Sequence, residues 1–145
     1  MRYYEDLVEG VVEESGKRTV TREELIAFAS QYDPQYFHAD ETAAKSSFFG
    51  DVIASGIHTM AIWRQLDHEI AQDIKWICGV AWDDVRFPKA VRPGDTLRAK
   101  AQCLSKRLSG SDPRRGVVVY QYTLLNQDDE VVFTCRSTNL VERKP

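Results

Sequence analysis

The sequence feature that most constrains the fold is a long helical segment from about Ser55 to Ala71. Apolar residues recur within it at steps of three and four, the spacing typical of one face of an α-helix. They are Ile57, Met60, Ala61, Trp63, Leu66 and Ile70, and the first half of the segment is apolar nearly all round. Because a helix that is apolar on most sides is buried, the rest of the chain must enclose this one.

Four strand-like segments follow the helix and can form that enclosure. The second alternates apolar and polar residues, and the third is apolar on both faces, which predicts cover from the helix and from a partner subunit. The segments run from Trp76 to Val85, Leu97 to Cys103, Val117 to Leu125 and Val131 to Val141. Turn residues at 92–95 and a hairpin loop at 126–130 separate them. One long apolar helix beside a mostly antiparallel sheet predicts an α+β fold.

The N-terminal part is predicted to contain one strand or hairpin and two shorter helices. Residues 11–20 fit a single strand, or a hairpin that turns at Ser15-Gly16. Thr21 with Glu24 three residues later is a capping box, so a helix begins there. We expect it to end at Asp33, because a residue before proline disfavours the helical conformation. Asp40 can cap the second helix.

Length and charge narrow the class of protein. The chain has 145 residues and no linker-like stretch, which predicts one domain over residues 1–145. Its hydrophobic content of 43% is enough for a core, and a net charge of -3 without a basic stripe disfavours nucleic acid as a partner. The N-terminus lacks the pattern of a signal peptide, and no apolar stretch approaches the roughly 18 residues of a membrane span. We therefore expect a cytoplasmic protein without a membrane partner.

The three cysteines are an odd number at wide spacing. Cys78, Cys103 and Cys135 each lie in a strand-like segment, and they form neither a disulfide framework nor a Cys-x-x-Cys pair. This pattern predicts free cysteines in a reducing compartment, packed as small buried apolar side chains.

A carboxylate and an imidazole flank the expected end of the first helix. Asp33 and His38 are five positions apart, and a turn of that length can direct both side chains into one space. A histidine beside a carboxylate is a common arrangement for proton transfer near neutral pH. The same residues also fit a helix-ending turn and a loop histidine with satisfied hydrogen bonds, so the spacing leaves both interpretations open.

A run of small residues leads into the long helix and ends with Ser55-Gly56. The first N–H groups of a helix have no internal partner, and the helix dipole favours negative charge at that end. Gly56 would let a ligand approach the backbone, so its N–H group could stabilise an enolate oxygen. The alternative is a plain helix start in which Ser55 serves only as a cap.

Taken together, the ordered motifs resemble the MaoC-like dehydratases, a family that includes the R-specific enoyl-CoA hydratases. The similarity extends over nearly the whole chain, and the order and spacing of its motifs carry it. These motifs are Tyr4-x-Asp6-Leu7-x-x-Gly10, residues 33–40, Ala43-Ala44, Phe48-Phe49-Gly50, residues 53–59, Pro93-Gly94-Asp95 and the hairpin from Asn126 to Val132.

The resemblance implies a hot-dog fold, in which a curved antiparallel sheet wraps around one long helix beginning near Ser55. It also implies a homodimer, or a dimer of dimers, with an acyl-CoA tunnel beside the subunit interface and no cofactor other than the coenzyme A of the substrate. By this resemblance, Asp33 and His38 hold the catalytic water, and the Gly56 N–H group polarises the thioester carbonyl. The implied reaction adds water to a 2-enoyl thioester to give a 3-hydroxyacyl thioester, or runs in reverse.

One loop departs from the family pattern. Many members have Asp-x-Asn-Pro-Ile/Val-His, whereas here Pro34 directly follows Asp33 and Gln35-Tyr36 replaces Asn-Pro. We expect Tyr36, Phe37, Ser55 and Gly56 to contact the substrate. The bulky Tyr36 and Phe37 should in addition narrow the acyl pocket. Further positive residues fit either a solvated surface or contacts to CoA phosphates at the tunnel mouth. They are Lys89, Arg92, Arg114 and Arg115.

Two alternative functions stay open. A hot-dog thioesterase would place a carboxylate on or beside the central helix, and Asp67 and Glu69 lie near the far end of that segment. A non-catalytic acyl-CoA-binding protein would explain the altered loop after Asp33. We expect no metal site, because His58 and His68 lack further ligands at zinc spacing. Motifs of serine hydrolases, nucleotidases and dinucleotide-dependent enzymes are missing.

Overall fold

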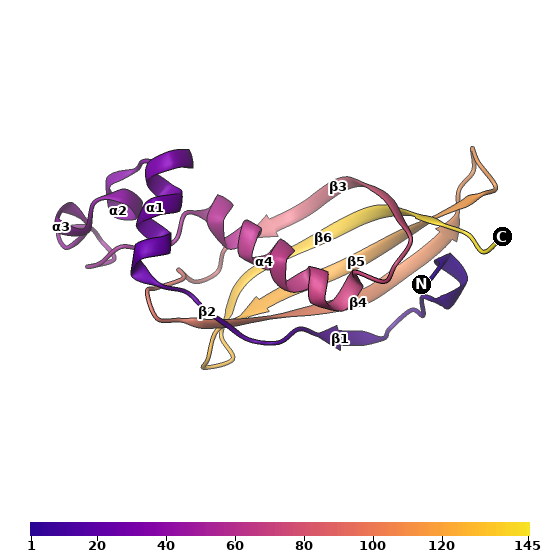
Figure 1. The fold of residues 1–145 in the computed structure, drawn as a ribbon, viewed down its shortest axis with the longest axis horizontal. Helices are drawn as coiled ribbons and strands as arrows, with labels where there is room; N and C mark the ends of the chain where they lie inside the picture. The colour runs from indigo at the N-terminus through magenta and orange to yellow at the C-terminus, as the bar shows by residue number, and fades with distance from the viewer.

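A curved antiparallel sheet and one long helix make up most of the protein (Figure 1). The computed structural model describes all residues from 1 to 145. After a short 3-10 turn at Tyr4–Asp6, the order is β1 (Val12–Glu14), β2 (Arg18–Thr19), α1 (Arg22–Tyr32), α2 (Tyr36–Ala39), α3 (Glu41–Ala44), α4 (Gly56–Ala71), β3 (Trp76–Arg86), β4 (Thr96–Leu108), β5 (Arg115–Leu125) and β6 (Val131–Glu142). None of the helices is long and apolar enough to cross a membrane.

The sheet has the strand order β1-β4-β5-β6-β3, and β2 also pairs with β4. All four of the predicted long strands are therefore present. The hairpin alternative for residues 11–20 is wrong, because β1 and β2 both pair with β4 and not with each other. Between them, Ser15 stays beside β4, where its backbone N–H donates to Ala99 O at 2.9 Å and its hydroxyl accepts from Ala99 N at 2.8 Å.

Helix α4 lies against the sheet and buries Trp63, Leu66 and Ile70 of its predicted apolar face, as expected. Its first half is less covered than predicted, because Ile57 and Ala61 are exposed and Met60 is half-buried. Trp63 has no exposed surface, and its ring lies 4.9 Å from that of Tyr122 and 5.2 Å from that of Phe133. The buried residues of β4 alternate with half-buried ones, so one face of the sheet supplies the core. The protein therefore has two layers: the long helix is one, and the sheet, whose inner face packs against the helix, is the other.

Helices α1, α2 and α3 gather beyond the N-terminal end of α4, and both chain termini lie at the opposite end of the molecule (Figure 1). The Thr21 hydroxyl accepts a hydrogen bond from Glu24 N at 3.2 Å, which is one half of the predicted capping box, whereas the Glu24 carboxylate pairs with Arg18. The Asp40 carboxylate likewise caps α3 by accepting from Ala43 N at 2.9 Å. Helix α2 was not expected, because four residues show no helical period and, unlike α3, it has no side-chain cap to mark its start.

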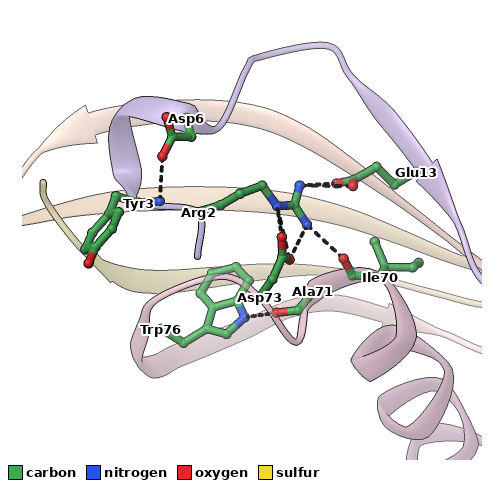
Figure 2. Close-up of polar contacts among 8 residues, drawn as sticks. All are labelled: Arg2, Tyr3, Asp6, Glu13, Ile70, Ala71, Asp73 and Trp76. Atoms are coloured by element: carbon green, nitrogen blue, oxygen red, sulfur yellow. Dashed lines mark hydrogen bonds and ion pairs between the residues drawn. The ribbon is translucent and has the colours of Figure 1, made fainter.

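At the end of the molecule that holds the termini, Arg2 joins three segments (Figure 2). Its guanidinium donates to both carboxylate oxygens of Asp73 at 2.8–3.1 Å and to Glu13 at 3.0 Å. It also donates to Ile70 O at 2.8 Å, in the last turn of α4. One side chain therefore connects the N-terminus, β1 and the C-terminal end of the central helix.

The cysteine prediction is correct for two residues and wrong for one. All three thiols are free, and Cys103 and Cys135 are buried, where desolvation raises the pKa of Cys135 to about 12. Cys78 is exposed because it lies on β3, the strand at one edge of the sheet. Strand-like sequence around a cysteine does not reveal whether that strand is central or at an edge.

Candidate active site

The end of α1 and the short helix α2 bring Asp33 and His38 together. Asp33 is the C-terminal cap of α1, with φ -153° and ψ 73°, and Pro34 prevents the helix from continuing. The chain then turns into α2, which carries His38 as its third residue. The Nε2 atom of His38 lies 3.9 Å from Oδ2 of Asp33.

The orientation of His38 is fixed by the backbone. Its Nδ1 atom lies 2.8 Å from the carbonyl oxygen of Ile53, and only 7% of the residue is exposed. Because a carbonyl oxygen can only accept, Nδ1 carries the hydrogen in the neutral ring. The Nε2 atom is then left with a free lone pair directed toward Asp33.

The hydroxyl of Ser55 fixes the carboxylate of Asp33, the other member of the pair. Its Oγ atom donates to Oδ2 of Asp33 at 2.7 Å, and the residue is fully buried. Ser55 makes no side-chain cap on α4 although it occupies the N-cap position. The plain-cap alternative from the sequence therefore does not describe this hydroxyl, which contacts the candidate acid/base pair instead.

The separation within the pair suits a bound water. At 3.9 Å, Nε2 and Oδ2 are too far apart for a direct hydrogen bond. Both atoms accept hydrogen bonds, and a water molecule between two acceptors can donate to each. The arrangement can therefore hold one water and remove a proton from it.

Gly56 lies beside this pair, at the start of α4. As the first helical residue it has an N–H group without a partner inside the helix. Gly56 lines a cavity of about 260 Å³ together with His38, Thr59 and Phe87. A Cβ atom on Gly56 would come within 3.1 Å of the Phe87 ring, so a larger residue would push into this wall.

Tyr36 and Phe37 do not line that cavity. Tyr36 is exposed, and its ring meets Phe37 edge to face. Phe37 packs against His38, with ring centroids 4.4 Å apart, and against Phe49, which does line the cavity. The contact of these two residues with a substrate stays a prediction, and of the two only Phe37 packs against the histidine.

Of the four positive residues considered for CoA phosphates, Arg114 and Arg115 do not line this cavity, and Lys89 and Arg92 lie in different places. Lys89 lines the cavity, and its ammonium group forms an ion pair with Glu130. Arg92 is outside the lining and donates to the carbonyl oxygen of Phe49 at 3.0 Å. Only Lys89 thus lies at the cavity, and the Glu130 carboxylate partly neutralises its positive charge.

The carboxylates considered for a thioesterase are remote from Gly56. Asp67 is buried in the second half of α4 and lines a different cavity, and Glu69 is exposed and accepts from Gly16 N at 2.8 Å. Nowhere do three or more His, Cys, Asp or Glu side chains gather as metal ligands would. His58 stacks on Phe28, and burial lowers its pKa to about 4.

Several residues of the site could not be found from the sequence. The Ile53 carbonyl is a backbone group, and no residue type signals its role. Phe87, just after β3, and Thr59, on α4, also line the cavity. A weak signal existed only for Phe87, an aromatic residue before Pro88 where a strand-like segment ends.

Comparison with known proteins places the chain in a family. The family model described as "MaoC like domain" matches residues 5–124. A crystal structure of a MaoC-like dehydratase from Rhodospirillum rubrum is 36% identical and superposes with a TM-score of 0.88, covering 100% of this chain and 99% of that one. The 3-hydroxyacyl-thioester dehydratase Z of Mycobacterium tuberculosis is 34% identical over 84 residues, which are 56% of each chain.

A third protein supports the fold alone. A conserved protein of Mycobacterium tuberculosis described as having a double hotdog fold superposes with a TM-score of 0.83 at 14% identity, over 99% of this chain and 45% of that one. Its likeness agrees with the wrapped sheet and single long helix seen here. The chain therefore has the hot-dog fold and belongs to the MaoC-like dehydratase family.

Proposed function

We propose that the protein is an acyl-thioester hydratase or dehydratase that adds water to a 2-enoyl-CoA or removes it from a 3-hydroxyacyl-CoA. The observation that carries this proposal is the 3.9 Å gap between His38 Nε2 and Asp33 Oδ2. Ile53 O fixes the orientation of His38 on one side of the gap, and the Ser55 hydroxyl fixes Asp33 on the other. The sequence relatives that act as dehydratases support the same class of reaction.

Binding of the thioester follows from the position of Gly56. The thioester carbonyl oxygen accepts a hydrogen bond from the Gly56 N–H group, and the dipole of α4 adds positive potential at that point. Both effects grow when the carbonyl becomes an enolate, so they lower the barrier and not only the binding energy. The cavity beside Gly56 provides room for the carbons next to the carbonyl.

Hydration then needs one water and two proton transfers. One member of the Asp33–His38 pair takes a proton from the held water as its oxygen bonds to C3, and the C2=C3 double bond shifts toward the carbonyl. The pair then delivers a proton to C2 of the resulting enolate, and the carbonyl forms again. The pair ends in its starting protonation state, and the reaction needs no bound cofactor other than the coenzyme A of the substrate.

The association state is part of the same proposal. β3 is paired only with β6 and presents its second edge to solvent, with Ile77, Val80 and Val85 among its exposed apolar residues. Long unpaired edge strands readily add another strand. We assign this edge to a second copy of the chain, which makes the protein a homodimer.

A two-signal assay tests the reaction. Crotonyl-CoA and longer enoyl-CoAs are mixed with the protein, and the loss of enoyl absorbance and the release of free thiol are recorded separately. Loss of absorbance without thiol is the expected result. Release of thiol would instead identify a thioesterase, and binding without either signal would identify a non-catalytic acyl-CoA-binding protein.

Substitution of the pair tests the residue assignment. Asp33→Asn and His38→Ala should each lower kcat by at least about a hundredfold, because each removes a proton acceptor from the water site. Asp40→Asn, seven positions from Asp33 and outside the cavity, is the matched control and should keep the wild-type rate. Near wild-type turnover in both variants of the pair would show that another group activates the water.

A further inference from the structure

The hydroxyl of Thr59 makes no hydrogen bond within the protein. Only 3% of the residue is exposed, although a buried hydroxyl normally has a partner. A threonine in a helix often donates to the carbonyl oxygen four residues before it. For Thr59 that oxygen belongs to Ser55, which accepts from Thr59 N at 3.0 Å and not from the hydroxyl. The Oγ1 atom is not enclosed by protein atoms, so it is open to the cavity of about 260 Å³ that Thr59 lines.

Thr59 lies on the same side of α4 as Gly56. It follows Gly56 by three residues, which is nearly one turn and about 4.5 Å along the helix axis. Side chains of a helix lean toward its N-terminus, so the Thr59 hydroxyl extends back toward the Gly56 N–H group. Both residues line the same cavity. The two donors can therefore meet at one acceptor atom of a ligand.

The other polar side chains of this cavity already have partners. His38 Nδ1 is bonded to Ile53 O, and its Nε2 atom can only accept. Lys89 forms an ion pair with Glu130, and its side chain is 47% exposed, so water screens its charge. Among the lining side chains, Thr59 is thus the neutral donor that is left for a substrate.

An oxygen that gains negative charge suits a site with two such donors. A hydrogen bond to an ionised oxygen is about twice as strong as one to a neutral oxygen, and the dipole of α4 adds positive potential at this end. The χ1 angle of a β-branched residue in a helix is restricted, so the Thr59 hydroxyl needs little reorganisation when the charge develops. The pair of donors therefore favours an enolate over a carbonyl.

We propose that Thr59 is a further catalytic residue, whose hydroxyl and the Gly56 N–H group together bind the thioester oxygen as it becomes an enolate. This inference rests on the proposed function for the position of the thioester. Thr59 donates a hydrogen bond and transfers no proton, so both proton transfers stay with Asp33 and His38. The two donors lower the barrier because the oxygen they contact carries more charge in the transition state than in the substrate.

A set of three variants tests the role of the hydroxyl in turnover. Thr59→Val removes the donor and keeps the shape of the side chain. It should lower kcat for crotonyl-CoA hydration at least about tenfold, with less than about threefold change in KM, because the lost bond strengthens in the transition state. Thr59→Ser keeps the donor and should stay within about threefold of the wild-type kcat. Thr123→Val, on β5 and outside the cavity, is the matched control and should have the wild-type kcat.

A complex without turnover reports the same contact. Acetoacetyl-CoA loses a proton from C2 to give an enolate, which is recorded by its near-ultraviolet absorbance. At one pH, the ratio of enolate to ketone bound to Thr59→Val should be about tenfold lower than in wild type. Thr59→Ser and Thr123→Val should keep the wild-type ratio. The affinity for butyryl-CoA, which stays a neutral thioester, should change less than about threefold in Thr59→Val.

An unchanged kcat and enolate ratio in folded Thr59→Val would overturn the proposal, and Thr59→Ala replaces this variant should it not fold. Equal losses in Thr59→Val and Thr59→Ser would also overturn it, since packing and not the hydroxyl would then be responsible. Weaker binding of butyryl-CoA to Thr59→Val with an unchanged kcat would assign the hydroxyl to the acyl group and contradict the enolate contact. A protein that shows the predicted enolate ratios but does not hydrate crotonyl-CoA would contradict the reaction and not the role of Thr59 at the oxygen.

Discussion

The hydroxyl of Ser55 stands at the N-terminus of α4 and bonds Asp33 there, so a residue type that usually caps a helix here orients a carboxylate. Two more single residues have the same character. His38 is held through Ile53 O, and Gly56 is kept small by the Phe87 ring. At this scale the candidate site depends on groups that fix one another at hydrogen-bond or van der Waals distance.

Ser55→Ala tests this positioning role. The variant loses the 2.7 Å hydrogen bond to Asp33 Oδ2, and the carboxylate is then free to rotate away from the water position. We expect kcat to fall about tenfold, equal to one hydrogen bond, with KM nearly unchanged because the Ser55 hydroxyl is bonded to Asp33 and Ser55 does not line the cavity. Ser47→Ala removes another loop hydroxyl, which donates to Ala44 O, and should have the wild-type kcat. An equal fall in kcat in both variants would indicate that loss of either hydroxyl loosens the loop in general.

His58 gives the stability a pH dependence. Its Nδ1 atom is buried without a partner, the residue is 6% exposed, and burial lowers its pKa from 6.5 to about 4. The unfolded chain therefore binds a proton more readily than the folded one. This histidine has no effect above about pH 6.5 and destabilises the protein as the pH falls from there toward 4.

The matching variant is His58→Phe, which keeps a flat ring against Phe28 and cannot be protonated. Urea unfolding at pH 7 and at about pH 4.5 should show that wild type loses about 2 kcal/mol more than His58→Phe between the two conditions. The exposed His68→Gln variant should lose as much as wild type. Equal losses in wild type and His58→Phe would mean that His58 is protonated in the folded state.

At the scale of elements, hydrophobic periodicity identified α4 and the four long strands, because burial of one face repeats along each of them. It did not identify α2, which is four residues long, and it left open how residues 11–20 pair. Ser15 decides that question through its two hydrogen bonds to Ala99, a residue more than eighty positions away. Pairing partners of short strands are a property of the sheet and not of the segment.

The Arg2 contacts provide a test at this scale, because they hold the N-terminus, β1 and the end of α4 together (Figure 2). Arg2→Met keeps the apolar stem and should lower the free energy of unfolding by about 1–2 kcal/mol, since the Arg2 side chain is 27% exposed and its charge is partly screened. Urea unfolding at neutral pH measures the loss. Arg2 lowers the pKa of Asp73 below 3.8, so the ion pair contributes fully above that pH and is lost only on further acidification.

Arg114→Met is the control for Arg2, because Arg114 pairs only with Asp112 in an exposed turn. It should unfold at the wild-type urea concentration. An Arg2→Met variant that is as stable as this control would show that the three segments are held by packing alone.

On the scale of the whole molecule, the two edges of the sheet differ. One edge is formed by the short strands β1 and β2, whereas the other is the eleven-residue strand β3 with exposed apolar side chains. A long apolar edge attracts a further strand, and lysine on such an edge prevents pairing. The proposed dimer therefore forms through β3.

The double variant Ile77→Lys, Val85→Lys should sediment as a monomer, because two charges on β3 would face the same charges of the second copy. Val12→Lys places a charge on β1, at the opposite edge of the sheet, and should leave the association state unchanged. Analytical ultracentrifugation distinguishes the two. A monomeric wild type, or a dimer that survives both lysines, would exclude β3 as the interface.

The sequence by itself determined the α+β class, the long central helix, the end of α1 at Asp33-Pro34 and the resemblance to the MaoC-like dehydratases. These features depend on periodicity, turn residues and motif order along the chain. Only the tertiary structure decided that Ser55 bonds Asp33, that Ile53 O orients His38, that Cys78 is exposed and that Asp67 is buried. Each of these depends on contacts between residues distant in the chain. Such contacts follow from how the sheet closes around α4, and no local pattern encodes them.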